Sequence, residues 1–192
     1  MADAGHRGSG GRAPVRPGVR AWLDSIPLTA RMIFYAIFFL TGVLVGLPYL
    51  AYQIDVHLPA CRVDIGVFRY VGVAVFVLFF VIYARGSYTL TRLGRGAYVE
   101  FDPPKEFVAT GPFCWCRNPI AGSVVGMILG EALAFSSVGI FLLFLVAIPL
   151  AHLQVVLLEE PLLERRFGSA YNDYRARVPR WFPRPPGNEG AR

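Results

Sequence analysis

The chain alternates between long apolar blocks and short polar segments. Residues 32–52 and 65–84 are two nearly unbroken apolar blocks, each with about the ~20 residues that a transmembrane helix requires. A longer apolar region, residues 119–158, is interrupted near its middle by the small and polar residues of "AFSSVGI". This break predicts two further helices, at 119–135 and 138–158, joined by a tight turn. We therefore expect an all-α polytopic membrane bundle with about four transmembrane helices, the last two forming a hairpin.

The first helix of that hairpin carries a stripe of small residues. Gly122, Gly126, Gly130 and Ala134 recur every four residues, so they lie on one face of a helix. In lipid, such a stripe lets two helix backbones approach closely and gain van der Waals contact. We expect this face to pack against another helix.

Composition agrees with a membrane protein. The 192 residues are 55% hydrophobic and only 17% charged, whereas soluble domains carry about a quarter charged residues. The net charge of +6 comes from basic residues that flank the apolar blocks. This distribution indicates topology signals and lipid-headgroup contact, and we expect no nucleic-acid partner.

The basic residues also predict an orientation. They gather before the first apolar block, after the second and after the fourth, whereas the segment after the first block holds only Arg62, beside Asp55 and Asp64. The positive-inside rule then places both termini and residues 85–118 on the cytoplasmic side of an integral, multi-pass membrane protein.

The chain ends are expected to lie outside the membrane domain. Residues 1–24, rich in Gly, Arg and Pro, predict a disordered basic tail; residues 184–192 form a second tail, and 25–183 form the domain. The cysteines lack the second pair or nearby histidines that a zinc site needs, so we expect no metal. We interpret them as small apolar fillers. They are Cys61, Cys114 and Cys116.

Two polar segments carry the candidate chemistry. The first, "GPFCWCRNPIAG" (residues 111–122), combines a Gly-Pro turn, two aromatic residues and Arg-Asn-Pro at the start of the third helix, where Pro119 is well tolerated. The second, residues 159–183, begins with Glu159 and Glu160, and carboxylates at a membrane boundary indicate a functional site. Because both segments are expected on one side of the membrane, we expect them to meet.

The second segment is also amphipathic. Apolar and aromatic residues recur at helical spacing with charges between them, which predicts one amphipathic helix on the cytoplasmic surface. These residues are Leu162, Leu163, Phe167, Tyr171 and Tyr174.

The two motifs, with the apolar hairpin between them, resemble the isoprenylcysteine carboxyl methyltransferase and phospholipid methyltransferase superfamily of integral-membrane enzymes. The resemblance spans about residues 105–183. It implies S-adenosylmethionine as the cofactor and methyl transfer as the reaction. By position, the cofactor-binding residues that it implies are Lys105, Glu106, Phe107, Val108, Phe113, Asn118, Pro119, Ile120, Ala121, Glu159 and Glu160.

The chain departs from the family pattern at three positions. Asn118 stands where the prenylcysteine enzymes have histidine, and Ala121 stands where many members have tyrosine. Val155 stands where the prenylcysteine enzymes contact their substrate through an arginine. Asparagine can still form hydrogen bonds to a cofactor, whereas alanine lacks the aromatic ring that a tyrosine would add to the wall of the cofactor pocket.

The residue types suit methyl transfer. Transfer from a sulfonium needs positioning, exclusion of water and matched charges, and no metal or covalent intermediate. We expect Arg117 and Glu159 to be catalytic: Arg117 can hold the cofactor's carboxylate in a fork, and Glu159 can accept from its ammonium or ribose hydroxyls. The alternatives are a lipid-headgroup anchor for Arg117 and an ion pair with Arg165 or Arg166 for Glu159. His152 is either a general base or bonded to a neighbouring helix.

The expected function is methyl transfer from S-adenosylmethionine to a lipophilic acceptor at the cytoplasmic membrane face, most like isoprenylcysteine carboxyl methylation. Phospholipid amine N-methylation and methylation of a small thiol stay open as alternatives. From another class, a non-enzymatic scaffold or transporter subunit with a degenerate site would fit the departures at Asn118 and Ala121.

Overall fold

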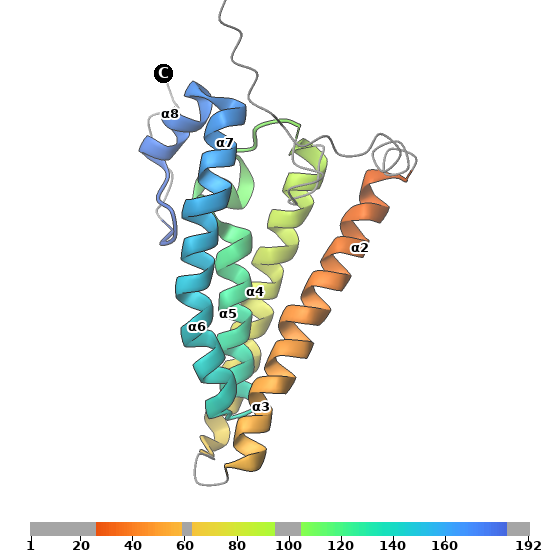
Figure 1. Ribbon diagram of the computed structural model, residues 1–192, viewed down its shortest axis with the longest axis vertical. Coiled ribbons are helices and arrows are strands. Elements are labelled where there is room, and N and C mark those ends of the chain that lie inside the picture. The colour runs from red at the N-terminus through yellow and green to blue at the C-terminus, as the bar shows by residue number, and fades with distance from the viewer. Residues whose placement is uncertain (1–25, 59–62, 95–104, 184–192) are drawn as a thin grey trace, which may run out of the picture.

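Every regular element that the computed structural model describes, over residues 26–58, 63–94 and 105–183, is helical (Figure 1). The predicted tails and Cys61 lie outside these residues. The helices are α2 (Leu28–Thr41), α3 (Leu47–His57), α4 (Arg69–Thr89), α5 (Pro119–Ala134), α6 (Val138–Gln154), α7 (Glu160–Phe167) and α8 (Ser169–Arg177). Shorter turns are π-helical at Gly42–Gly46, Leu90–Gly94 and Val155–Glu159, and 3₁₀ at Gly66–Phe68 and Gly111–Cys114. The predicted all-α bundle is confirmed.

Three continuous helical rods are long and apolar enough to cross a membrane, namely Thr29–His57, Gly66–Gly94 and Val138–Phe167. They cover three of the four predicted spans, apart from residue 65, and extend beyond their C-terminal ends, in agreement with a multi-pass membrane protein. The fourth predicted span is α5, whose 16 residues reach only about 24 Å. It begins at a proline, and Ser136 ends the turn after it in a left-handed conformation. α5 packs against α4 and α6 and contains much of the buried core.

Gly126 and Gly130 of the small-residue stripe pack closely against another helix, as predicted, and that helix is α4. A Cβ atom at Gly126 would lie 2.4 Å from the Phe79 ring, and one at Gly130 would lie 2.6 Å from the backbone nitrogen of Phe76. α4 contributes its own small residue, because a Cβ at Gly72 would lie 2.3 Å from the Ala134 nitrogen. The two backbones approach so closely because glycines stand at the crossing.

One prediction about the polar residues was wrong. Asp55 was assigned to a loop, but it lies inside α3 and is 3% exposed. Its carboxylate accepts hydrogen bonds from the Ser137 hydroxyl and from the Gly139 N–H at 3.2 Å. Ser137 in turn caps α6 by accepting from the Ile140 N–H at 3.0 Å. Asp55 therefore stabilises the start of α6, where a negative charge also suits the helix dipole.

Replacing Asp55 with alanine is expected to destabilise the bundle. The change leaves the Ser137 hydroxyl and the Gly139 N–H buried without this acceptor, at a cost of about 2–4 kcal/mol. Thermal unfolding in detergent measures the effect as a melting temperature lower by about 5–10 °C. The control is Asp64→Ala, because Asp64 is exposed and, among the described residues, accepts a hydrogen bond only from the nearby Gly66 N–H. Equal melting temperatures of Asp55→Ala and Asp64→Ala would contradict the assignment.

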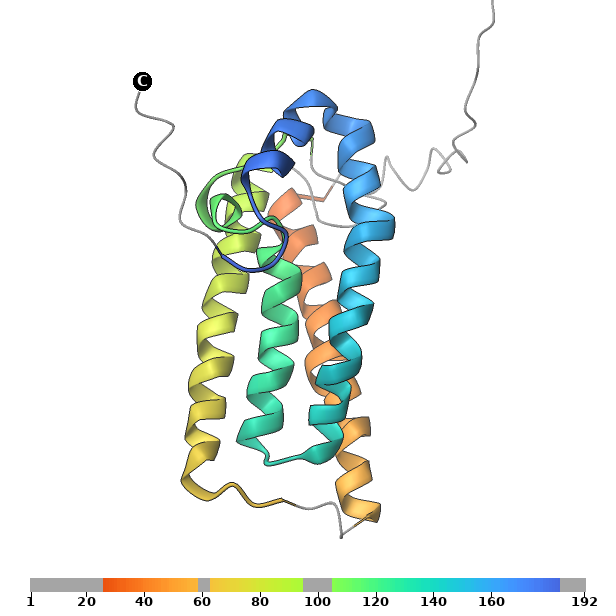
Figure 2. The same cartoon turned by 90° about the vertical axis from the view of Figure 1, so that its left-hand side faces the viewer.

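The predicted amphipathic helix is two helices rather than one. α7 continues the α6 rod to Phe167, and the chain then reverses at Gly168, whose φ of 53° is a conformation that favours glycine. α8 therefore folds back over the start of α5 instead of running on along the surface (Figure 2). Its two tyrosines, Tyr171 and Tyr174, are buried.

Candidate functional site

A cleft lies at the end of the bundle where α5 begins and the α6–α7 rod ends. Its larger part encloses about 460 Å³, including its open mouth, and a smaller part of about 200 Å³ adjoins it. Both parts share Phe113, Arg117 and Asn118. The smaller part is completed by Pro119, Ile120, Ala121 and Glu159. The larger part is completed by Leu90, Glu106, Phe107, Val108, Leu163, Phe167, Tyr171 and Tyr174. The two segments that were expected to meet therefore do so.

A π-helical turn, Val155–Glu159, positions the acidic pair at the cleft. Such turns shift the register of a helix and are frequent at functional sites. Glu159, at the end of the turn, lines the smaller part of the cleft and accepts from Gln154 Nε2 at 3.2 Å. Val155, at its start, is fully buried.

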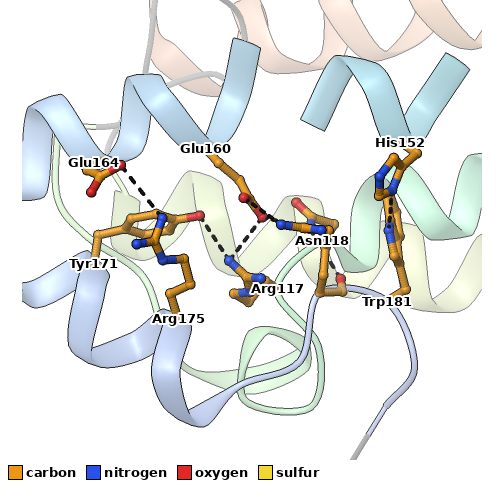
Figure 3. A network of polar contacts seen from close by, with 9 residues as sticks. Arg117, Asn118, His152, Glu160, Glu164, Tyr171, Arg175 and Trp181 are labelled. Carbon is orange, nitrogen blue, oxygen red and sulfur yellow. Dashed lines mark hydrogen bonds and ion pairs between the residues drawn. The ribbon is translucent and has the colours of Figure 1, made fainter. Parts of the chain in front are cut away.

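Glu160 does not line the cleft but lies beside it, where it contacts Arg117 (Figure 3) and also Arg180. Arg180 donates to both of its carboxylate oxygens, at 2.7 and 2.9 Å, and Arg117 Nη1 lies 3.0 Å from one of them. Arg117 also donates to the Tyr171 hydroxyl at 3.3 Å. The side chains of Arg117 and Glu160 are each 9% exposed. Arg117 is therefore a buried cation at the cleft wall rather than a lipid-headgroup anchor.

Asn118 precedes the first residue of α5 and points its side chain toward the C-terminal segment. Its Nδ2 donates to the carbonyl of Arg180 at 3.2 Å, and the neighbouring Arg117 N–H donates to the carbonyl of Pro179 at 2.8 Å. Pro119 then begins α5 without an N–H group to satisfy. These bonds hold the Arg-Asn-Pro corner at the cleft.

Aromatic rings form one side of the larger part of the cleft. The Phe107 ring lies 5.3 Å from Phe167, 6.3 Å from Tyr171 and 5.3 Å from Tyr174, centre to centre. The Tyr174 hydroxyl donates to the Phe113 carbonyl at 2.6 Å. Burial raises the pKa of Tyr174 well above its ordinary value, so the hydroxyl stays protonated and keeps this bond. The cluster joins residues 105–114 to α7 and α8.

Most of the residues expected to bind the cofactor line the cleft. Lys105 and Glu160 do not: Lys105 is exposed, and its N–H donates to the Gly94 carbonyl. The residues that line it as expected are Glu106, Phe107, Val108, Phe113, Arg117, Asn118, Pro119, Ile120, Ala121 and Glu159. A direct contact of each with a cofactor stays a prediction.

Sequence reasoning missed part of the wall. Leu163, Phe167, Tyr171 and Tyr174 were interpreted only as the apolar side of an amphipathic surface helix, but they line the cleft. Their helical spacing was a usable signal, since it showed a common face without showing what that face meets. Arg180 was missed because its two hydrogen bonds to Glu160 join residues that are 20 positions apart in the sequence, and a local pattern does not show such a contact.

The remaining polar candidates have structural roles here. His152 Nδ1 accepts a hydrogen bond from Trp181 Nε1 at 3.1 Å. The expected partner was a neighbouring helix, but Trp181 lies in the non-helical segment after α8, and His152 is exposed. Cys114 Sγ donates to the Gly111 carbonyl. Burial raises the pKa of the Cys116 thiol, which favours its protonated form. Both cysteines are free, as expected of fillers.

Comparison with known proteins agrees with this geometry. The phospholipid methyltransferase family matches residues 67–170, which include α4 to α7 and thus most of the cleft. A similar curated protein is the nickel-cobalt-cadmium resistance protein NccN of Alcaligenes xylosoxydans xylosoxydans, 31% identical over 96 residues. That alignment covers 50% of this chain and 45% of the relative, so the chain spans less than half of the relative's length. Because the family match covers more than half of the chain, this membrane protein belongs to the phospholipid methyltransferase family.

Proposed function

We propose that this protein transfers a methyl group from S-adenosylmethionine to a lipophilic acceptor that enters from the bilayer. The observation that carries the proposal is the shared cleft, in which Arg117 and Asn118 from one motif meet Glu159 from the other. Methyltransferases of this family use S-adenosylmethionine.

The charges and donors around the cleft fit this cofactor. Arg117 and Arg180 face one carboxylate, Glu160, so the cluster keeps one net positive charge. The Arg117 Nε atom is buried and has no hydrogen-bond partner among the described residues. A second carboxylate, that of the cofactor's methionine part, would supply the missing acceptor. Glu159 offers a carboxylate to the cofactor's ammonium, and Asn118 offers an amide.

The chain's own residues account for the rest of the chemistry. When bound, S-adenosylmethionine supplies a methyl group on a positively charged sulfur. The aromatic cluster around Phe107 excludes water, and Glu159 lowers the cost of a positive charge in an apolar site. Arg117 and Asn118, held by the C-terminal segment, orient the ligand.

Among lipophilic acceptors, the site favours a lipid amine over a prenylcysteine carboxylate. Val155 is apolar and fully buried, so it presents no charge to an acceptor carboxylate. Glu159 at the cleft can accept the proton that an ammonium must lose before methylation. The family's description, phospholipid methyltransferase, points to the same acceptor class.

The name of the relative NccN concerns resistance to metal ions. Within residues 26–58, 63–94 and 105–183, no group of three or more His, Cys, Asp or Glu side chains is arranged to hold a metal ion.

Binding of S-adenosylhomocysteine to the detergent-purified protein tests the proposal by isothermal titration. We expect wild-type protein to bind and Glu159→Ala and Asn118→Ala to bind about tenfold more weakly, because each loses a hydrogen bond of the site, charge-assisted for Glu159. The control is Glu164→Ala, whose exposed carboxylate pairs only with Arg175 in the structure. We then expect transfer of labelled methyl groups into the lipid fraction of a membrane extract.

The alternative of a non-enzymatic scaffold predicts a different result. Wild-type protein that gives no heat with S-adenosylhomocysteine at millimolar concentration would refute the enzyme and favour the scaffold. Label that appears on a protein rather than on lipid would keep the enzyme and replace the acceptor.

A further inference from the structure

Residues 179–181, called the strap below, run back across the cleft wall after α8. All three bond to residues of the Arg-Asn-Pro corner or of α6, although they lie beyond the region that the family matches. The contacts are Pro179 O with the Arg117 N–H at 2.8 Å, Arg180 O with Asn118 Nδ2 at 3.2 Å, and Trp181 Nε1 with His152 Nδ1 at 3.1 Å. The strap thus joins the Arg-Asn-Pro corner to the α6 rod.

The Arg180 side chain adds a fourth contact, and its geometry differs from that of Arg117. Arg180 engages both oxygens of Glu160 through Nε and Nη2, at 2.7 and 2.9 Å. Arg117 reaches the same carboxylate with Nη1 alone, at 3.0 Å, and its Nε has no hydrogen-bond partner among the described residues. A carboxylate that already accepts two hydrogen bonds from one arginine has only its remaining lone pairs available for hydrogen bonds from a second arginine.

We propose that Arg180 is a positioning residue for the cofactor's carboxylate. By occupying both oxygens of Glu160, it prevents Glu160 from forming a two-bond fork with Arg117. Arg117 therefore keeps a donor for a ligand carboxylate at the cleft that it lines. This inference rests on the proposed function, and it deepens it by assigning a role to a residue outside the cleft.

The side-chain burial supports this arrangement. Glu160 and Arg117 are each 9% exposed, so their mutual attraction is weakly screened by water. Without Arg180, the nearest strong donor left to Glu160 is Arg117, and the two charges would neutralise each other. The net positive charge that attracts a ligand carboxylate would then be lost.

Two ligands separate this role from a purely structural one. S-adenosylhomocysteine carries the carboxylate, whereas 5′-methylthioadenosine lacks the whole amino-acid part. In isothermal titration we expect Arg180→Gln to bind S-adenosylhomocysteine about tenfold more weakly than wild type and 5′-methylthioadenosine equally well. The control is Arg177→Gln, because Arg177 is exposed and bonds only to the Asp173 carbonyl in the structure. It should leave both affinities unchanged.

A double variant provides a second measurement if Arg180→Gln folds poorly. In Glu160→Gln/Arg180→Gln the carboxylate that would neutralise Arg117 is gone, so we expect affinity for S-adenosylhomocysteine to recover to within about threefold of wild type. Three results would each overturn the inference. They are equal losses of affinity for both ligands in Arg180→Gln, no loss of affinity for S-adenosylhomocysteine in Arg180→Gln, and no recovery of that affinity in the double variant. Wild-type protein that binds neither ligand would instead overturn the proposed function and, with it, the inference.

Discussion

Replacing Gly130 with leucine is expected to prevent α4 and α5 from packing and to abolish most of the folded protein. A Cβ atom at this position would lie 2.6 and 2.8 Å from the backbone N and Cα of Phe76. Backbone atoms cannot rotate away as a side chain can, so the helices must separate. Overpacking of a core costs about 1–3 kcal/mol where neighbours can adjust, and we expect more than about 3 kcal/mol here.

Gly122→Ala is the matched control for this change. Gly122 belongs to the same stripe on the same helix, but its added Cβ would meet only a Trp181 ring atom at 4.0 Å, an ordinary contact. Size-exclusion chromatography and thermal unfolding in detergent compare the two variants. A Gly130→Leu protein that elutes and melts like wild type would show that the α4–α5 crossing is not as close as described.

Phe107→Ala is expected to release residues 105–114 from α7 and α8. Its ring has three aromatic neighbours, two of them with centres 5.3 Å away. Removing a well-packed phenylalanine costs about 3–5 kcal/mol, and since Phe107 is only half-buried we expect about 3 kcal/mol. Hydrogen exchange measures the loss as faster exchange of the backbone amides of 105–114, with little change in α4 and α5.

Phe182→Ala serves as the control because Phe182 is 86% exposed. It should exchange like wild type throughout. If Phe107→Ala instead speeds exchange equally in every helix, the aromatic cluster would belong to the global core. If no region changes, the cluster would not hold the segment at all.

The sequence was a good guide to the helices and to their closest crossing. Apolar blocks of membrane-spanning length predict helices because the bilayer interior leaves backbone groups no other partner. The glycine stripe predicted a close contact for the same local reason, since small residues four apart lie on one face. The partner of that face, α4 with its own Gly72, came only from the structure.

Charged residues were less predictable, because their roles depend on what lies across the fold. In the sequence, Asp55 looks like a residue of an interfacial loop. In the structure, α3 continues past the apolar block and places Asp55 against the start of α6. From the sequence, Arg180 was expected to be one of several basic residues on the cytoplasmic side. In the structure, the strap places it against Glu160. Each partner lies 20 or more residues away, and a local pattern carries no information about such pairs.

The acidic pair, Glu159 and Glu160, shows the difference between what the sequence predicted and what only the tertiary structure decided. From residue type and position at the end of a membrane helix, the sequence alone predicted a functional site at Glu159 and Glu160. It could not say which of the two faces the cleft, because neighbouring residues on a helix point about 100° apart and a π-helical turn changes the register. Only the packing of the α6–α7 rod against the Arg-Asn-Pro corner turned Glu159 into the cleft and Glu160 toward the arginines.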